Sequence, residues 1–405
     1  MSHRPDARRL YRDLAWTWPI ISPPEDYVEE TREYRRLFRA HAGFPVRTVF
    51  HLGCGGGHID ATLKRWYRVT GVDISPPMLR LARRLNPDVE YIRGDMRTVR
   101  LGRVFDAVLL ADSVDYMTTD ADLRAAFATA LLHLRPGGAF ITCAELAPSW
   151  FRQDETIATA GRRGTTEIVL IENRYDPDPG DTWIEATFVY LIRRNGRLTV
   201  ETDSHRLGIF PLATWSRLLA SVGFVVTRAD GPRGAPSTPP SATFVGVRPT
   251  YPGRVDVPPA RLRDAVRQGR GTLRKFGFEC SATVGDLRRW FSADTAYPDV
   301  SLREVLDHPL LVVHELVEID EVKRQGLQLT KDVIVAHPDE VDAAHVRATE
   351  VEVRIAAALG NRRHLASRAK DIARWIDDPI VPREHRTRYR HLLADTRRRL
   401  QGLGR

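Results

Sequence analysis

The sequence predicts an α/β domain that carries an antiparallel strand insertion and is followed by an α-helical domain. Three observations support this. Short apolar runs alternate with segments of helical spacing as far as Cys143. Strand-like runs separated by turn signals then follow, and from Arg261 onward the spacing is helical. We expect a first domain over 1–250, with 1–44 as an N-terminal lid and helix, a linker over 251–260, and a helical domain over 261–405.

The stretch from Val46 to Asp73 reads as a strand, a glycine turn, a helix and a second strand. Val46 to Leu52 is apolar and rich in β-branched residues, while Ile59 to Tyr67 has helical spacing. Four glycines lie between them: Gly53, Gly55, Gly56 and Gly57. Glycine lets backbone amides approach a ligand closely, and an acid after the next strand, here Asp73, can accept both ribose hydroxyls. A nucleotide-type ligand is therefore expected at this turn.

Two readings of the glycine loop compete. A dinucleotide site has the pattern G-x-G-x-x-G, whereas an S-adenosylmethionine site has the shorter G-x-G-x-G. The third glycine falls two residues after the second, and His58 occupies the place of the last glycine of the longer pattern. The shorter pattern fits better.

The following strands strengthen this interpretation. Val89 to Asp95 predicts a third strand that ends in Asp95 and Met96, and Phe105 to Ala111 is as apolar as a buried parallel strand. A helix is expected over 122–134, then the turn Arg-Pro-Gly-Gly at 135–138 and a fifth strand over 139–143. With HLGCGGG, GVDIS, GDM, FDAVLLADS and LRPGG in this order, the chain resembles the class I S-adenosylmethionine-dependent methyltransferases over roughly residues 45 to 250.

This resemblance implies a Rossmann-like domain, S-adenosylmethionine as cofactor, and a role for each matching position. The glycine loop would wrap the methionine moiety, Asp73 would hold the ribose diol, and Asp95 would accept from the adenine amino group with Met96 beside the ring. Ala111 and Asp112 would lie near the sulfonium. His51 stands where the family often has an acid. The implied cofactor-binding set is His51, Gly53, Cys54, Gly55, Gly57, Asp73, Ile74, Asp95, Met96, Ala111 and Asp112. For Cys54 and His58 we favour packing over chemistry.

Two segments are expected to complete the pocket. The segment before the glycine loop has a helix from about Asp26, and Tyr11, Trp16 and Trp18 are lid candidates, although aromatics there also suit core packing. Strand-like runs at 167–173, 183–193 and 198–205 predict an antiparallel insertion above the active site. With HRLGIF at 205–210, this arrangement resembles small-molecule methyltransferases, including sugar amine N-methyltransferases.

The resemblance implies methyl transfer to a small-molecule nitrogen or oxygen. Alignment and desolvation supply most of such catalysis, and an oxygen acceptor also needs a base. We take Asp112, His205 and Tyr11 as the catalytic candidates, with Tyr116 near them. Asp115 and Glu145 are interpreted as solvated loop carboxylates. Two rival functions stay open: RNA or protein methylation with the helical domain as docking module, and a non-catalytic cofactor-binding scaffold.

Composition agrees with a cytoplasmic enzyme. The chain has 405 residues, a net charge of +9 and three widely spaced cysteines, Cys54, Cys143 and Cys280, which suggest neither a disulfide framework nor a thiolate zinc site. Apolar runs are too short to span a membrane, and the amino terminus has no apolar signal core. Basic and acidic residues are interspersed, so we do not expect a nucleic-acid partner. The short apolar runs argue against a membrane partner, and the family resemblance implies a small-molecule partner. The oligomeric state is left open.

The second domain is expected to begin after the proline- and glycine-rich run 231–240, a last strand over 242–247 and the linker, and to be a helical bundle whose final helix starts at Pro382. His314 and Glu318 share one helix face, as do Asp342 and His345. Such pairs on two facing helices could bind a metal. Charged faces of surface helices explain the same spacing, so we predict that no metal binds tightly.

Overall fold

The computed structural model describes residues 8–229, 241–295, 301–377 and 383–403. The run 231–240, Pro382 and the first seven residues of the expected lid lie outside this part. The described residues form two compact units, one of residues 1–101 and 105–248 and the other of 102–104 and 249–405. The boundary falls two residues before the expected one. No helix among the described residues is long and apolar enough to cross a membrane.

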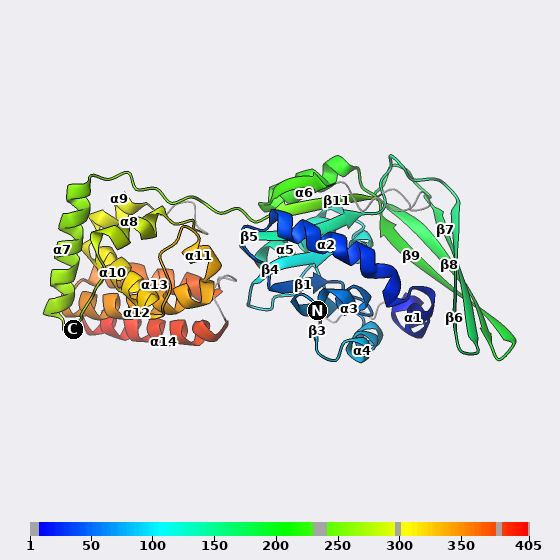
Figure 1. Ribbon diagram of the computed structural model, residues 1–405, viewed down its shortest axis with the longest axis horizontal. Coiled ribbons are helices and arrows are strands. Elements are labelled where there is room, and N and C mark those ends of the chain that lie inside the picture. The colour runs from blue at the N-terminus through cyan, green and yellow to red at the C-terminus, as the bar shows by residue number, and fades with distance from the viewer. Residues whose placement is uncertain (1–7, 230–240, 296–300, 378–382, 404–405) are drawn as a thin grey trace. The chain divides into compact units, whose positions relative to one another are not determined.

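The first unit is built on a seven-stranded sheet (Figure 1). The strand order is β10-β11-β5-β4-β1-β2-β3, and only β11 runs antiparallel to the rest. The strands are β1 (Thr48–Leu52), β2 (Arg68–Asp73), β3 (Glu90–Arg93), β4 (Phe105–Leu110), β5 (Leu134–Ala144), β10 (Val225–Ala229) and β11 (Ala242–Val247). The predicted Rossmann-like α/β fold is thereby confirmed.

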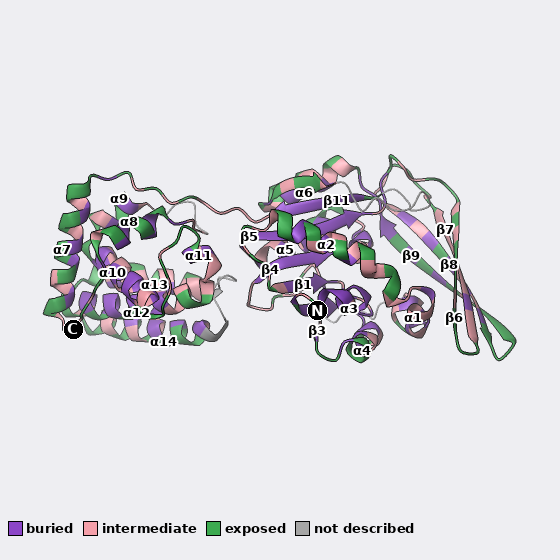
Figure 2. Ribbon diagram, viewed as in Figure 1, coloured by how far each residue is buried: buried purple, intermediate pink, exposed green. Residues whose placement is uncertain are grey.

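Helices cover both faces of this sheet, which explains why β4 has no polar face. Ala107 and Leu109 pack toward α2 (Val28–His41), α3 (His58–Leu63) and α4 (Pro76–Leu85). Val108 and Leu110 pack toward α5 (Asp120–Leu132) and α6 (Leu212–Val222) on the other face. A parallel strand buried on both faces reads as a continuous apolar run. Figure 2 shows the central strands in the colour of buried residues.

A second, antiparallel sheet stands beside the first (Figure 1). It contains the three expected strands, β7 (Thr166–Tyr175), β8 (Trp183–Arg194) and β9 (Arg197–Gly208), and also β6 (Glu155–Arg163). The sequence analysis missed β6 because none of its residues is buried, so its pattern lacks apolar alternation. The turn expected at 135–138 is also wrong, because these residues belong to β5. The pairing of β5 with β4 shifts its register there, and Gly137 has a φ of 78°.

The N-terminal segment packs on this second sheet. It contains the short helices η1 (Arg9–Tyr11), η2 (Ala15–Thr17), α1 (Trp18–Ile21) and η3 (Pro24–Tyr27). Leu14 and Ile21 are buried in one cluster with Ile168, Ile184 and Tyr190 of the antiparallel sheet. The segment is thereby fixed between the two sheets, at the edge where the glycine loop lies.

The second unit is all helical in its described part. Its helices are α7 (Pro259–Lys275), α8 (Val284–Ser292), α9 (Leu302–Asp307), α10 (Pro309–Arg324), α11 (Val333–Ala336), α12 (Pro338–Ala358), α13 (Arg362–Asp377) and α14 (Arg383–Gly402). The sequence analysis did not anticipate the single turn α11. Tyr251, expected in the linker, pairs with Thr295 through two backbone hydrogen bonds of 2.9 and 2.8 Å. The ordered unit therefore starts before α7.

The interpretation of α10 as a charged surface face is wrong. His314 is 2% exposed and Glu318 is 5% exposed, and both point toward His345 of α12. Asp342 is not part of this group, because its carboxylate accepts hydrogen bonds from His385 and from Tyr389. The periodicity located the face, but only the packing of α10 on α12 shows that it is buried.

Candidate active site

The glycine loop connects β1 to α3 in a conformation that requires glycine. Gly53, Gly55 and Gly57 have φ of 67°, 51° and 76°. A Cβ on Gly53 would lie 1.9 Å from Oγ of Ser113, whereas one on Gly55 would meet nothing within 4 Å. The loop is therefore packed closely at its first glycine and open at its second, where a ligand can approach the backbone.

Asp73, at the end of β2, is joined to this loop. Its Oδ2 accepts a hydrogen bond of 2.9 Å from the Gly55 N–H, and its Oδ1 accepts one of 2.8 Å from the Ser75 N–H. Burial raises the pKa of Asp73, and these two hydrogen bonds oppose that shift. Each carboxylate oxygen keeps acceptor capacity for a further donor, such as a ribose hydroxyl.

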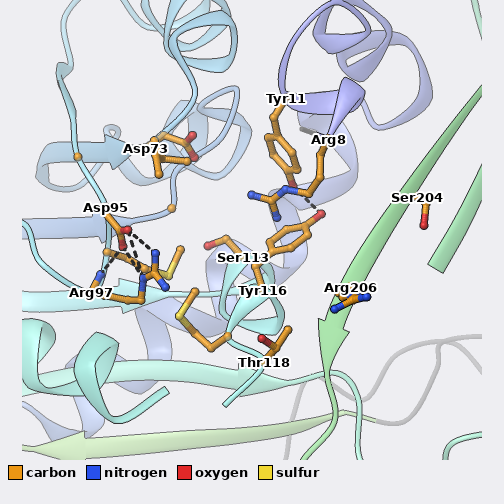
Figure 3. Close-up of a pocket in the computed structure, with 15 residues that line it drawn as sticks. Arg8, Tyr11, Asp73, Asp95, Arg97, Ser113, Tyr116, Thr118, Ser204 and Arg206 are labelled. Carbon is orange, nitrogen blue, oxygen red and sulfur yellow. Dashed lines mark hydrogen bonds and ion pairs between the residues drawn. The ribbon is translucent and has the colours of Figure 1, made fainter. Parts of the chain in front are cut away.

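A cavity of about 390 Å³ extends from the glycine loop across the ends of β2 and β3 (Figure 3). Asp73, Ile74, Asp95 and Met96 line it, as the family resemblance implies for the adenosine end. Asp95 is also paired with Arg97, which donates to it from Nε at 3.0 Å and from Nη2 at 2.7 Å. This ion pair, drawn in Figure 3, fixes the orientation of the carboxylate.

His51 replaces the usual acid in β1, and the structure places an acid behind it. Nδ1 of His51 lies 2.7 Å from Oδ1 of Asp60, which is fully buried and also accepts from the Tyr91 hydroxyl at 2.9 Å. Both His51 and Cys54 line a second cavity of about 250 Å³. Burial raises the pKa of the Cys54 thiol well above its usual range, as befits a packing thiol, and lowers that of His58 to about 4.

The second cavity has an acidic wall at the carboxyl ends of β4 and β5. Ala111, Asp112, Asp115, Glu145 and Glu172 line it. The interpretation of Asp115 and Glu145 as solvated loop carboxylates is wrong. Asp115 is 6% exposed, and burial together with the charge of Asp112 raises its pKa well above its usual range.

Glu145 belongs to the same wall. Burial raises its pKa most, and the charges of Asp112, Asp115 and Glu30 raise it further. Burial and the charge of Asp112 also raise the pKa of Glu30, on α2, to about 7. The neighbouring acids of this wall thus raise the pKa values of Asp115, Glu145 and Glu30 together with burial. Arg174, 2.7 Å from Glu172, is the basic residue lining this cavity.

Tyr11 and His205 are connected through Tyr116. The Tyr11 hydroxyl donates to that of Tyr116 at 2.9 Å, and Tyr116 Oη lies 3.0 Å from His205 Nδ1. His205 Nε2 lies 2.8 Å from Asp203, which also accepts from the Leu10 N–H at 2.8 Å. Tyr11 and Tyr116 line both cavities, whereas His205 is 1% exposed and lines neither. Any effect of His205 on bound molecules therefore passes through Tyr116.

The two tryptophans among the lid candidates differ in their surroundings. Trp18 lines the second cavity and stacks on His58 with 6.2 Å between ring centroids. Trp16 packs instead under the guanidinium of Arg194, 3.9 Å from its ring centroid. Of the three lid candidates, Tyr11 and Trp18 line a cavity and Trp16 does not.

Two buried polar atoms test whether an adenosyl amino acid fits. Oγ of Ser113 and Oδ1 of Asp115 are buried and have no hydrogen-bond partner among the described residues, and both residues line the second cavity. A buried polar group without a partner is costly, so these atoms fit a site completed by a polar ligand. With the open backbone at Gly55 and the two acids Asp73 and Asp95, the residues present suit S-adenosylmethionine.

Sequence reasoning missed several residues of these cavities. Arg8, Arg206 and Ser204 line the first cavity, and Glu172 and Arg174 line the second. Four of them come from β7 and β9 of the inserted sheet. The alternation of side chains along β7 and β9 predicts which of these residues share a face of the sheet. It does not predict which face lies toward the glycine loop.

Comparisons with known proteins agree with this geometry. Residues 49–138 match a family described as "Methyltransferase domain". The chain is 28% identical over 218 residues to dTDP-3-amino-3,6-dideoxy-alpha-D-glucopyranose N,N-dimethyltransferase from Streptomyces fradiae, covering 52% of this chain and 82% of that protein. It is 31% identical over 227 residues to dTDP-4-amino-2,3,4,6-tetradeoxy-D-glucose N,N-dimethyltransferase from Saccharopolyspora spinosa, covering 55% and 87%.

Solved structures show the same fold. The crystal structure of DesVI from Streptomyces venezuelae is 25% identical, with a TM-score of 0.51 over 60% of this chain and 99% of that one. The matching family, relatives and fold leave no ambiguity about the enzyme class or the cofactor. The chain belongs to the class I S-adenosylmethionine-dependent methyltransferases.

Proposed function

We propose that this enzyme methylates the amino group of an amino sugar carried on a nucleotide. The observation that carries the proposal is the acidic wall of Asp112, Asp115 and Glu145 beside the glycine loop. An amine reaches the site mostly as an ammonium ion, which carboxylates attract and hold by charge-assisted hydrogen bonds. A carboxylate acceptor would be repelled by the same wall. The relatives named above act on amino groups of dTDP-sugars.

The same wall would provide the proton transfer that N-methylation needs. Only a neutral amine has the lone pair that attacks the methyl carbon, so the ammonium must first give up a proton. We assign this step to Asp112 and Glu145, which line the cavity together. Burial and the charge of Asp112 raise the pKa of Glu145, and a carboxylate with a raised pKa is a better proton acceptor than a solvated one. After transfer, the new N–H proton leaves by the same route.

Alignment and exclusion of water are assigned to the lid. S-adenosylmethionine supplies, when bound, an electrophilic methyl group on a sulfonium sulfur. An in-line displacement would require the residues of the cavity to hold the amine on the side of the methyl group opposite the sulfur. We propose that Tyr11 and Trp18 cover the reacting atoms and that Tyr116, held by His205, positions Tyr11.

The cofactor-binding roles also belong to the proposal. Asp73 would hold the ribose diol, Asp95 the adenine amino group and Met96 the ring face, with the backbone of Gly53, Cys54 and Gly55 around the methionine moiety. Gly57 lines neither cavity, and its part would be the turn into α3, where its φ is 76°. His51 would reach the same moiety from β1, with Asp60 fixing its ring. Ile74 would pack on the ribose, and Ala111 on the sulfonium side.

The nucleotide part of the acceptor is expected at the end of the first cavity that β9 lines, away from Asp73 and Asp95, which would hold the cofactor (Figure 3). Arg8 and Arg206 line it and are the basic side chains that a diphosphate requires. We further propose that the enzyme works in the cytoplasm and without a nucleic-acid partner; the three cysteines, all free thiols, fit a reducing compartment.

Calorimetry on protein loaded with S-adenosylhomocysteine tests the proposal. Three matched nucleotide sugars would be titrated: one with an amino group, one with a hydroxyl and one with a carboxylate at the same carbon. We expect the amine to bind more tightly than the hydroxyl and the carboxylate to bind least. Equal binding of all three, or a preference for the carboxylate, would exclude the acidic wall as the acceptor site.

A further inference from the structure

Three side chains of the helical unit converge on one point. Nε2 of His314 lies 3.0 Å from Oε2 of Glu318 and 3.1 Å from Nδ1 of His345, and the last two atoms are 3.1 Å apart. His314 and Glu318 share one face of α10, and His345 faces them from α12. The three atoms thus form a nearly equilateral triangle between two packed helices.

This triangle has the size of one face of a metal coordination octahedron. In an octahedron, adjacent ligand atoms are separated by √2 times the bond length. Bonds of about 2.0–2.2 Å from imidazole nitrogen and carboxylate oxygen therefore give separations of about 2.8–3.1 Å. Tetrahedral coordination would need about 3.3–3.6 Å. Two histidines and one carboxylate on an octahedral face leave three positions open, a set typical of Fe²⁺ and related ions.

With Glu318 ionised and both imidazoles neutral, protons cannot satisfy all three edges. If both imidazoles donate to Glu318, two N–H groups face each other across the 3.1 Å edge between His314 and His345. If His314 donates to His345 instead, a lone pair of His345 faces the carboxylate of Glu318. Each arrangement leaves one repulsive edge. A cation at the centre attracts all three lone pairs at once.

A second group of side chains prepares His314 for this role. Its Nδ1 lies 2.8 Å from Oε2 of Glu352, a fully buried carboxylate that Arg368 holds at 2.7 Å and that His364 also contacts. When the Nδ1–H of His314 donates a hydrogen bond to Glu352, the neutral ring presents its Nε2 lone pair to the triangle. A carboxylate behind a histidine in this way is the usual support of a metal-binding histidine.

We propose that His314, Glu318 and His345 bind one divalent transition-metal ion of the Mn²⁺, Fe²⁺ or Co²⁺ type. The site is separate from the methyl-transfer cavities, and its residues come from α10 and α12 alone. Access is from the His345 side, where 27% of that side chain is exposed while His314 is nearly enclosed. The ion keeps open positions for water or an exogenous ligand there.

Titration of the full-length protein with Co²⁺ after chelation and dialysis tests the site. We expect saturable binding of a single equivalent, with d–d absorption bands of low intensity typical of six-coordination and a concentration-dependent rise in melting temperature. Mn²⁺ should compete with Co²⁺. No saturable binding would overturn the proposal and leave a proton-sharing cluster.

Variants locate the binding. H345N and E318Q should each weaken Co²⁺ binding by more than about tenfold, whereas H391A, which changes an exposed histidine of the same unit, should leave it unchanged. H345N is the primary variant, because the native His345 side chain is only partly buried. Circular dichroism can verify that this variant folds. Equal Co²⁺ affinity in H345N, E318Q and the native protein would place the ion elsewhere and refute the assignment.

Discussion

The Tyr11 hydroxyl donates a 2.9 Å hydrogen bond to the hydroxyl of Tyr116, which joins the N-terminal segment to the loop after β4. Oγ of Ser75 donates a second bond, of 2.6 Å, to the Tyr11 carbonyl oxygen. Tyr11 is thus held through both its side chain and its backbone. Its geometry therefore depends on the hydroxyl of Tyr11 and not only on its ring.

Tyr11→Phe should weaken cofactor binding by about 0.5–1.5 kcal/mol, or roughly twofold to tenfold, since it removes one hydrogen bond and keeps the ring. The dissociation constant of S-adenosylhomocysteine, from calorimetry, measures this. Tyr175→Phe is the matched control, because that side chain is 44% exposed. A lid role for the Tyr11 hydroxyl is excluded if the two variants bind alike.

Asp73→Ala should leave the fold intact and weaken cofactor binding by about 1–3 kcal/mol, because two ribose hydroxyls lose their buried acceptor. Calorimetry with S-adenosylmethionine measures the change in dissociation constant. The native protein should bind S-adenosylmethionine but not NAD. Asp88→Ala, at an exposed ion pair with Lys64, is the control. An unchanged dissociation constant in Asp73→Ala, or NAD binding without an adenosylhomocysteine signal, would contradict the assigned site.

Glu145→Gln should stabilise the protein at neutral pH while slowing methyl transfer by about a hundredfold or more. In the unfolded chain this carboxyl ionises near its ordinary pKa of about 4.3. Its pKa is raised in the folded state, so the folded state binds more protons above that value and stability falls as pH rises. The Glu145→Gln variant has no carboxyl group to ionise at this position, so it does not lose this stability.

Thermal unfolding from pH 4 to pH 8 measures the effect, with Glu167→Gln on β7 as the exposed control. The difference in melting temperature between Glu145→Gln and the native protein should grow in favour of the variant as pH increases. A constant difference, or one that shrinks, would show that the pKa of Glu145 is not raised in the folded protein.

Cleavage of the chain between Arg248 and Pro249 should give two separately folded pieces, because the two units have their own cores. This point lies before the linker expected over 251–260, since Tyr251 and Gly253 of that linker already bond to Thr295 and Ala293 of the helical unit. Residues 1–248 should retain cofactor binding by calorimetry. Aggregation of this piece, or loss of binding, would make the helical unit part of the active-site structure.

The sequence predicted the features that depend on local order. The glycine spacing, Asp73 and Asp95 all lie at ends of consecutive strands, so chain order alone places them together. Asp115 and Glu145 were misread because their burial depends on β7 and α2, which are distant in the chain. In the same way, the spacing of His314 and Glu318 identified a helix face, but the choice of His345 over Asp342 as its partner depends on how α10 meets α12.

The central claim is that the acidic wall binds an amine, which the enzyme then methylates. The mass of the product tests this claim most directly. Native protein, Asp112→Asn and the exposed control Asp88→Asn would be incubated with S-adenosylmethionine and an amino-sugar nucleotide. We predict that native protein and the control add one or two methyl groups to the sugar nitrogen and that Asp112→Asn is slower by about a hundredfold or more. Methylation of a hydroxyl or carboxylate instead, or equal rates in all three proteins, would contradict the account.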